Sequence, residues 1–348
     1  MMKKFLLKIS YTLLPLWLIM VGLVSYVSLY ICPNISGDIG NLALIPFGKE
    51  YDTFLEQSML KDTLFKTIDK TDDLKNIHVD VLTIGDSFSQ QSNGGYQNYL
   101  ASKGLSVANC YRHLYSSPLQ FAYNIMQGSF IDSSQVKVLV VESVERDFQG
   151  VVKEFDTEKT IIPKSHTNHR GNVNKNEWSL ARTRDFFFYK MGMDNPIYSA
   201  KLDKKYFSSN YPQDLYFYYS DVENEMSIRK SNEEIVRKVF MTLSNKAEEK
   251  GIQLIMIIAV DKYDLYQNHI VNNPWPIKTV NEDIEKILGK RQDVLLAKKV
   301  LLPLVEKGEK DVFKFNDTHW SYKASASVAN ELYKRIITNH WCSQSQFY

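Results

Sequence analysis

The sequence predicts an α/β protein with a central parallel sheet, preceded by an N-terminal transmembrane helix. Short apolar runs rich in β-branched residues alternate with segments of helical length, which is typical of parallel sheets. A long uncharged run at the amino terminus is the second observation. The third is a serine that directly follows the first strand, at the sheet edge where open α/β folds place their chemistry. The expected strands are residues 79–85, 105–109, 136–142 and 252–260.

The amino-terminal run has the length and composition of a membrane anchor. Lys3, Lys4 and Lys8 precede an uncharged stretch, 9–37, whose most apolar part is 11–32. About 22 helical residues rise roughly 33 Å, enough to cross a hydrocarbon core of about 30 Å. We expect a retained single-pass anchor, with a cleaved signal peptide as the alternative. The lysines predict a cytoplasmic amino terminus, so the rest of the chain would lie on the periplasmic or extracellular side.

Charge and cysteine content narrow the function classes. Among 348 residues, 42 Lys and Arg nearly balance 40 Asp and Glu, so no basic field favours a nucleic-acid partner. Cys32, Cys110 and Cys342 have neither metal-binding spacing nor the even number of a disulfide framework. We expect no metal and no cofactor.

Gly and Pro residues interrupt long helices and strands, and their positions indicate where the domains begin and end. We expect an anchor over 1–37, a linker and lead-in over 38–75, and a catalytic domain over 76–340 with an insertion at about 150–230. Ser231 and Glu234 have the spacing of a capping box. Residues 294–305 are ambiguous, and 312–315 predicts a last strand. The expected helices are residues 51–70, 90–103, 119–130, 231–250, 281–288 and 324–337.

The expected insertion has no strand–helix rhythm. His166 and His169 have a spacing that could serve a metal, but no nearby Asp, Glu or Cys completes a site, so loop histidines are favoured. The aromatic clusters at 186–189 and 215–219 are more typical of core than of a platform for sugars.

Three residues could carry nucleophilic catalysis. Ser87 ends the Gly85-Asp86-Ser87 turn, and a serine hydroxyl needs a neighbouring base, itself oriented by a third group. Asp317 and His319 lie two residues apart before the last helix and could supply both. We expect the first strand and the last loop to be neighbours in a sheet ordered 2-1-3-4-5. The simpler alternatives are a serine that caps a helix and a surface histidine.

At these residues the chain resembles the SGNH/GDSL hydrolase superfamily, over about residues 79–148 and 230–338. The closer similarity is to alginate-type SGNH-like polysaccharide O-acetyltransferases, through residues 85–88 and 317–320 and the strand end with Glu142 and Arg146. The resemblance implies a three-layer αβα fold, an acyl-serine intermediate, and a multi-span membrane acyltransferase (MBOAT-type) that delivers the acyl group.

The chain departs from these families in two respects. The serine block precedes the Asp-x-His segment, as in ordinary SGNH enzymes and in the D-alanyl transfer proteins of teichoic acid systems. No Gly-x-Asn-Asp block supplies an oxyanion donor. The Ser87 N–H is therefore the first expected donor, and Asn109 and Arg146 are candidates for the second. Glu142 is a further candidate for binding substrate. A structural ion pair between Glu142 and Arg146 is the alternative for those two residues.

The resulting expectation is a membrane-anchored O-acyltransferase, most simply O-acetyl, that acts on a cell-surface or secreted polysaccharide. Ser87, His319 and Asp317 would be nucleophile, base and orienting carboxylate. A carbohydrate O-acetylesterase would use the same chemistry with water as acceptor. A non-catalytic glycan-binding assembly subunit is the alternative outside enzymes.

Overall fold

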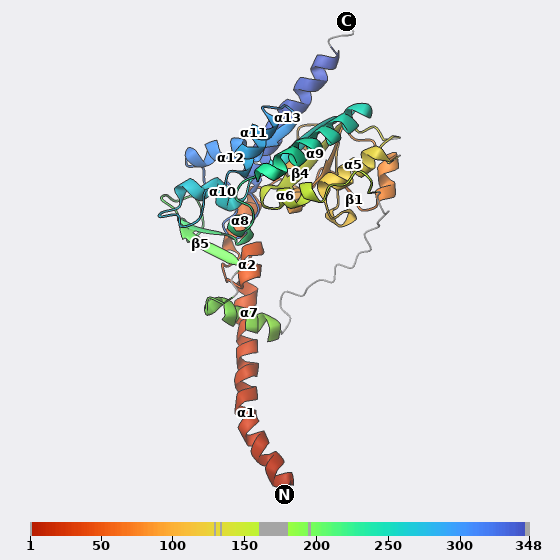
Figure 1. Cartoon of the computed structure of the whole chain (residues 1–348). Helices are drawn as coiled ribbons and strands as arrows, with labels where there is room; N and C mark the ends of the chain where they lie inside the picture. Colours follow the sequence, from red (N-terminus) through yellow and green to blue (C-terminus); the bar gives the residue numbers. More distant parts are fainter. Residues whose placement is uncertain (1, 129, 133, 160–179, 194–195, 345–348) are drawn as a thin grey trace.

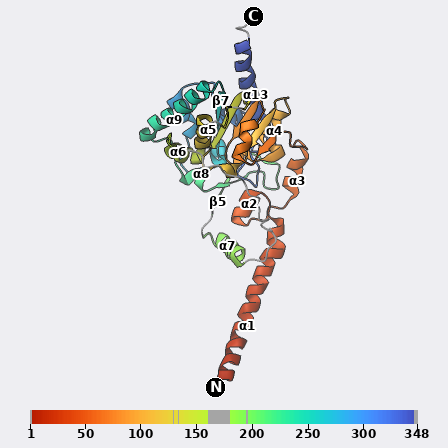
Figure 2. The ribbon, with the colours of Figure 1, turned by 90° about the vertical axis from the view of Figure 1, so that its right-hand side faces the viewer.

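The computed structural model describes residues 2–128, 130–132, 134–159, 180–193 and 196–344. A long amino-terminal helix, α1 (Met2–Tyr26), projects from a globular α/β body, and the end of the last helix lies on the opposite side of that body (Figure 1). A view at a right angle shows the same arrangement (Figure 2). The chain therefore places its apolar helix and its sheet in separate regions.

The body is built on a six-stranded parallel sheet in the order β1-β3-β2-β4-β7-β8. The expected order 2-1-3-4-5 is confirmed for its first four strands, which are β3, β2, β4 and β7. The fifth strand is β8 and not the expected strand over 312–315, and β1 adds one strand at the opposite edge. Residues 38–75, the expected linker and lead-in, contribute this strand. The strands are β1 (Lys66–Ile68), β2 (Val81–Ile84), β3 (Val107–Cys110), β4 (Val138–Val144), β7 (Gln253–Ala259) and β8 (Val294–Leu296).

Helices cover both faces of the sheet, which explains why its strands are apolar without alternation. Successive residues of one strand enter different cores: Val81 packs in one cluster and Leu82 in the other. The first face carries α4 (Tyr96–Ala101), α12 (Ala297–Glu306) and α13 (Tyr322–Gln344). The second carries α5 (Pro118–Gln127), α6 (Glu145–Lys153), α9 (Lys230–Glu249) and α11 (Val280–Leu288).

The apolar helix continues past Tyr26 through a π-helical turn, Val27–Ile31, and a 3₁₀ turn, Cys32–Asn34. Within the described residues, Lys8–Asn34 is the segment long and apolar enough to span a membrane, with a mean hydropathy of 2.0. Two short helices, α2 (Gly37–Ala43) and α3 (Glu50–Gln57), then lead the chain onto the sheet. The length and composition of the span are consistent with a single-pass anchor.

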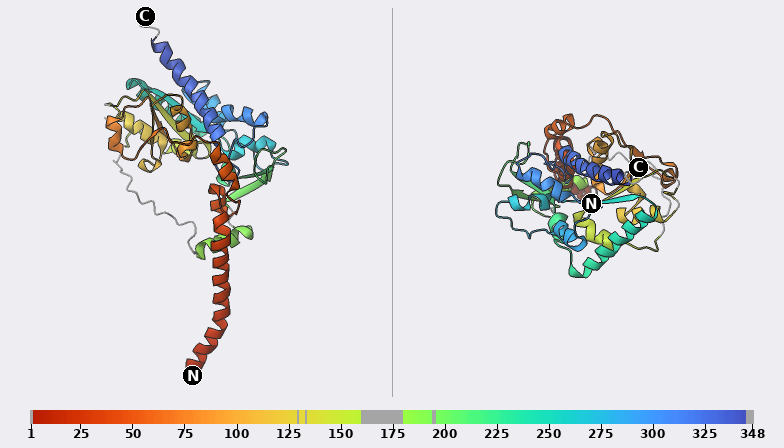
Figure 3. Two further views of the ribbon diagram at one scale, coloured as in Figure 1. Left: turned by 180° about the vertical axis from the view of Figure 1, so that it is seen from behind. Right: turned by 90° about the horizontal axis from the view of Figure 1, so that it is seen from above.

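The described part of the expected insertion holds α7 (Leu180–Lys190), the antiparallel pair β5 (Ile197–Lys201) and β6 (Asp214–Tyr218), and α8 (Ser220–Glu223). Helix α7 crosses the upper end of the apolar helix (Figure 3), where Phe186 packs with Val27 and Ile31. Of the two clusters expected to be core, Phe186, Leu215 and Phe217 are buried, whereas the other residues are half-buried. His166 and His169 lie outside the described residues.

Several expected elements differ from the structure. The expected helix 51–70 ends at Gln57, because residues 66–68 pair with β3 as a strand instead. The helix expected over 90–103 begins only at Tyr96, after two 3₁₀ turns. Arg229 is the N-cap of α9, so the capping box is wrong. Residues 312–315 form no strand; Phe313 makes an isolated antiparallel bridge with Trp320. The ambiguous region 294–305 becomes β8 and most of α12.

The glycine after β2 should tolerate no side chain. A Cβ at Gly85 would lie 2.1 Å from Ser89 Oγ and 2.5 Å from Glu142 Oε2, both inside the body. We expect Gly85→Ala to destabilise the chain by about 1–3 kcal/mol. Gly150, in the middle of α6 with nothing within 4 Å, is the matched control, and Gly150→Ala should stabilise by about 0.5–1 kcal/mol. Thermal unfolding of both variants in detergent measures the difference, and equal midpoints would contradict it.

Candidate functional site

The turn that carries Ser87 is fixed by the side chain of its neighbour. Strand β2 ends at Ile84, and the Asp86 carboxylate accepts the N–H of Phe88 at 3.0 Å and that of Val144, in β4, at 2.7 Å. Ser87 begins the following 3₁₀ turn, so its own N–H is not used by the hydrogen bonds of that turn. The turn therefore presents a half-buried hydroxyl and a backbone donor at the carboxyl edge of the sheet.

Glu142 and Asn109 support this turn from the neighbouring strands. Glu142 is fully buried, and its Oε2 accepts the Asp86 N–H at 3.1 Å and the Ser89 hydroxyl at 2.9 Å. Burial raises the pKa of Glu142, and the Asp86 charge raises it further, which favours a protonated acid. Asn109 donates to the Ser89 carbonyl at 2.9 Å and accepts from Thr83 at 2.7 Å. Glu142 and Asn109, two of the three expected oxyanion or substrate-binding residues, thus hold the turn.

Arg146 pairs with carboxylates of two other segments rather than with Glu142. Its Nη1 lies 2.7 Å from Asp261, after β7, and 3.3 Å from Asp221, in α8. The guanidinium also lies 6.0 Å from the centre of the Phe88 ring. Lys278 adds a second cation, 2.7 Å from Asp261. The expected Glu142–Arg146 ion pair is therefore wrong. Arg146 belongs instead to a buried cluster of charged residues beside the Ser87 turn.

Asp317 and His319 form a close pair in the loop before α13, residues 311–321, which we call the His319 loop. Asp317 Oδ1 lies 2.6 Å from His319 Nδ1 and also accepts the His319 N–H at 3.0 Å. Burial would raise the pKa of Asp317, but Lys314, His319 and a hydrogen bond from Asp38 hold it well below its usual range. An ionised Asp317 fixes the proton on Nδ1 and leaves Nε2 as the basic nitrogen.

The fold brings the serine turn and the His319 loop together. The rings of Phe88, next to Ser87, and His319 are 4.9 Å apart, centre to centre. His319 Nε2 is buried and has no hydrogen-bond partner among the described residues. The hydrogen bonds of the described residues include none between Ser87 Oγ and His319, and in unliganded sites such bonds often form only with substrate.

A fully buried lysine holds the backbone of the His319 loop. Lys262, in α10 (Lys262–Tyr266), donates from Nζ to the carbonyls of Lys314 at 2.7 Å, Phe315 at 2.8 Å and Asp317 at 3.1 Å. Burial lowers the pKa of Lys262 to about 7. Three acceptors match the three protons of an ammonium, so these contacts favour the charged form. Sequence reasoning missed this lysine, because an α-helical lysine is normally exposed.

Asp38 is a second residue that the sequence did not indicate. Its Oδ1 accepts the Thr318 N–H at 2.6 Å, and its Oδ2 lies 3.4 Å from His319 Nδ1. The one available signal was a carboxylate directly after the apolar run. Among the described residues, Asp38, Asp317 and His319 are a group that could hold a metal, with ligand atoms within 4.8 Å of one another. The 2.6 Å between Nδ1 and Asp317 matches a shared proton better, because two ligands about 2.1 Å from zinc lie more than about 3 Å apart.

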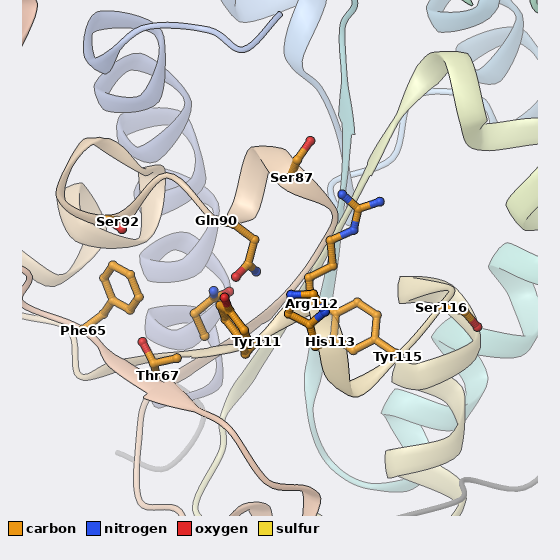
Figure 4. A pocket seen from close by; sticks show the side chains of 11 residues that line it. Phe65, Thr67, Ser87, Gln90, Ser92, Tyr111, Arg112, His113, Tyr115 and Ser116 are labelled. Carbon is orange, nitrogen blue, oxygen red and sulfur yellow. The ribbon is translucent and has the colours of Figure 1, made fainter. Parts of the chain in front are cut away.

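A pocket of about 520 Å³ opens beside Ser87 at the ends of β1, β2 and β3. Figure 4 shows Ser87 at its rim and Phe65, Tyr111 and Arg112 among its walls. This volume lies in the usual range for small-molecule sites. Asn109 also lines it, so one expected binding residue does face this space.

Replacing Lys262 with methionine should test the support of the His319 loop. Three buried carbonyls would lose their donor, and we expect a loss of about 3 kcal/mol or more. Lys153→Met removes an exposed ion pair with Glu225 and should cost about 0–1 kcal/mol. The pKa of Lys262 is lower in the folded chain, about 7, than in the unfolded chain. Between about pH 7 and 10 the unfolded chain therefore binds more protons than the folded chain. The free energy of unfolding of the wild type, relative to that of Lys262→Met, should rise with pH over this range. Equal thermal midpoints for the two variants would contradict the support role.

Comparisons with protein-family models, with curated proteins and with solved structures found no match to this chain. The α/β architecture and the site therefore rest on the residues and contacts described above. A function inferred for the chain has to be argued from the chemistry of Ser87, His319 and Asp317 and from their surroundings.

Proposed function

We propose that the chain is a membrane-anchored serine acyltransferase of SGNH type that acts outside the cytoplasmic membrane. The observation that carries the proposal is the Asp317–His319 pair at 2.6 Å, held against the ring of Phe88, the residue next to Ser87. A lone serine or a lone histidine at a sheet edge would support little. A serine turn, an oriented imidazole and a free Nε2 in one place are the parts that nucleophilic acyl transfer needs.

The proposed reaction has two symmetrical halves. Ser87 Oγ attacks the acyl carbonyl while His319 Nε2 takes its proton, and the leaving alcohol then takes that proton from the imidazolium. The acyl-serine is next attacked by an acceptor hydroxyl, whose proton passes through Nε2 to Ser87 Oγ. The Ser87 N–H is the first oxyanion donor, and Asn109 and Arg146 stay candidates for the second. No metal or cofactor is required by these steps.

The proposed acceptor is a sugar hydroxyl of a cell-surface or secreted polysaccharide. The pocket beside Ser87 combines aromatic walls from Phe65 and Tyr111 with polar groups such as Arg112, a mixture suited to sugars. The apolar helix keeps the site beside a membrane partner, in the proposal a multi-span acyltransferase that delivers the acyl group. A carbohydrate O-acetylesterase is the second candidate, because the same atoms serve when water is the acceptor.

Covalent labelling tests the nucleophile. A serine-directed phosphonate should label Ser87 in the full chain in detergent, and His319→Ala should lower the labelling rate by about 10³-fold or more, since the base is lost. Ser116, which lines the same pocket away from the turn, is the matched control, and Ser116→Ala should label normally. Labelling that persists unchanged in Ser87→Ala would refute the assignment.

Product analysis separates transfer from hydrolysis and from a binding role. The purified chain is given an activated acetyl ester, with and without polysaccharide, and acetylated glycan and free acetate are measured. The proposal expects glycan acetylation that Ser87→Ala abolishes. Acetate alone with every glycan would favour the esterase. If cells that make Ser87→Ala acetylate their glycan normally, a non-catalytic glycan-binding subunit becomes the better explanation.

A further inference from the structure

The segment between the apolar helix and the sheet is built into the candidate site. This juxtamembrane segment, residues 35–57, contacts the His319 loop along most of its length. Ile39 N donates to the Asn316 carbonyl at 3.1 Å, and Asn316 Nδ2 donates to Ser36 Oγ at 2.6 Å and Asp52 at 2.9 Å. Tyr51 donates to Asp311 at 2.9 Å and accepts the Phe315 N–H at 3.0 Å.

A glycine makes this close approach possible. Gly37 has a φ of +70°, which side-chain-bearing residues rarely adopt. A Cβ there would lie 2.0 Å from the Asn316 carbonyl oxygen. Position 37 therefore admits only glycine without movement of the backbone. The next residue, Asp38, is consequently set directly against Thr318 and the imidazole of His319.

Asp38 also lies close to Asp317, the partner of that imidazole. One carboxylate oxygen of each and a ring nitrogen of His319 lie within 4.8 Å of one another. Asp38 accepts both the N–H and the hydroxyl of Thr318, the residue between Asp317 and His319. Burial and the Asp317 charge raise the pKa of Asp38, whereas the pKa of Asp317 is lowered. Of the two carboxyl groups, Asp317 is therefore the one that more readily stays charged, and it faces Nδ1.

We propose that Asp38 is a positioning residue of this site, whose carboxyl group accepts the N–H and the hydroxyl of Thr318. Through these two bonds it fixes Thr318 and so holds the neighbouring Asp317 carboxylate against the imidazole of His319, although it does not itself touch substrate. The site is then made by two distant parts of the chain, the sheet body and the end of the membrane helix. The kinetic part of this inference rests on the proposed acyl transfer.

Three variants of Asp38 and its neighbour separate positioning from folding. Asp38→Asn keeps an oxygen that accepts the Thr318 N–H and an amide that can donate to the Thr318 hydroxyl, so it should retain the wild-type kcat. Asp38→Ala loses both bonds and should lower kcat by about 10- to 100-fold with little change in KM. Asp52→Ala removes a carboxylate from the same segment that binds Asn316 instead. It should lower the unfolding temperature as Asp38→Ala does, while kcat stays near wild type.

The outcomes are distinct. Asp38→Asn as slow as Asp38→Ala would overturn the proposal, and so would equal kcat losses in Asp38→Ala and Asp52→Ala. Activity lost with EDTA and restored by zinc would also overturn it, because the three side chains would then be metal ligands. Thermal unfolding of each full-length variant in detergent identifies any that fails to fold, and Asp38→Asn keeps the test valid in that case.

A chemical probe of His319 tests Asp38 without acyl transfer. Diethyl pyrocarbonate reacts with unprotonated imidazole, and mass spectrometry identifies the modified peptide. His319 should react faster in Asp38→Ala, because the loosened ring exposes Nε2, and at the wild-type rate in Asp38→Asn. This pattern in a chain whose Ser87→Ala variant is fully active would retain the role of Asp38 and refute only the acyl-transfer function. Equal rates in all variants would refute the role of Asp38.

Discussion

The backbone groups of the His319 loop must find hydrogen-bond partners without help from a sheet, because the isolated bridge of the loop, Phe313–Trp320, pairs two of its own residues. Side chains from elsewhere supply those partners. Lys262 binds three carbonyls from within the body, and Tyr51 and Asp38 bind N–H groups from the membrane side. The position of the imidazole is therefore the sum of contacts from two directions. Loss of either set would release the ring, even though neither set belongs to the reacting atoms.

Buried charge is concentrated at the same sheet edge. Arg146 and Lys278 lie among Asp221 and Asp261, and Glu145 adds a further carboxyl that accepts the Asp261 N–H at 2.7 Å. Burial raises the pKa of Glu145, and it raises that of Asp221 to about 7, so these acids are readily neutralised. Such clusters contribute little net stability, because desolvation offsets attraction. Their effect here is geometric: they join α6, α8 and the end of β7 beside the serine turn.

Those parts of the fold that depend on a local sequence pattern could be predicted from the sequence. The buried strands β2, β4 and β7 are continuous apolar runs, and the order of the first four strands was expected from the fold that the chain resembles. That order also predicted that Ser87 and His319 lie at one edge. Strand β8 was missed because three residues give no period. Asp38 could not be predicted, because it meets Thr318 across 280 residues of chain. The partners of Arg146 were missed for the same reason: Asp221 comes from a segment without sequence rhythm.

The short passage between the apolar helix and the site limits where chemistry can occur. Three residues separate Asn34, the last residue of the apolar stretch, from Asp38, and the four Cα–Cα steps between them span at most about 14 Å. Residues 35–38 do not form a flexible linker, since α2 starts at Gly37 and Asp38 is bound to the His319 loop. With Lys8–Asn34 across a bilayer, the imidazole would stand close above the lipid headgroups and could not swing outward. If the chain catalyses the proposed acyl transfer, a polymer would be modified only where it touches the membrane surface, and a membrane-embedded donor would meet the serine by diffusion in two dimensions.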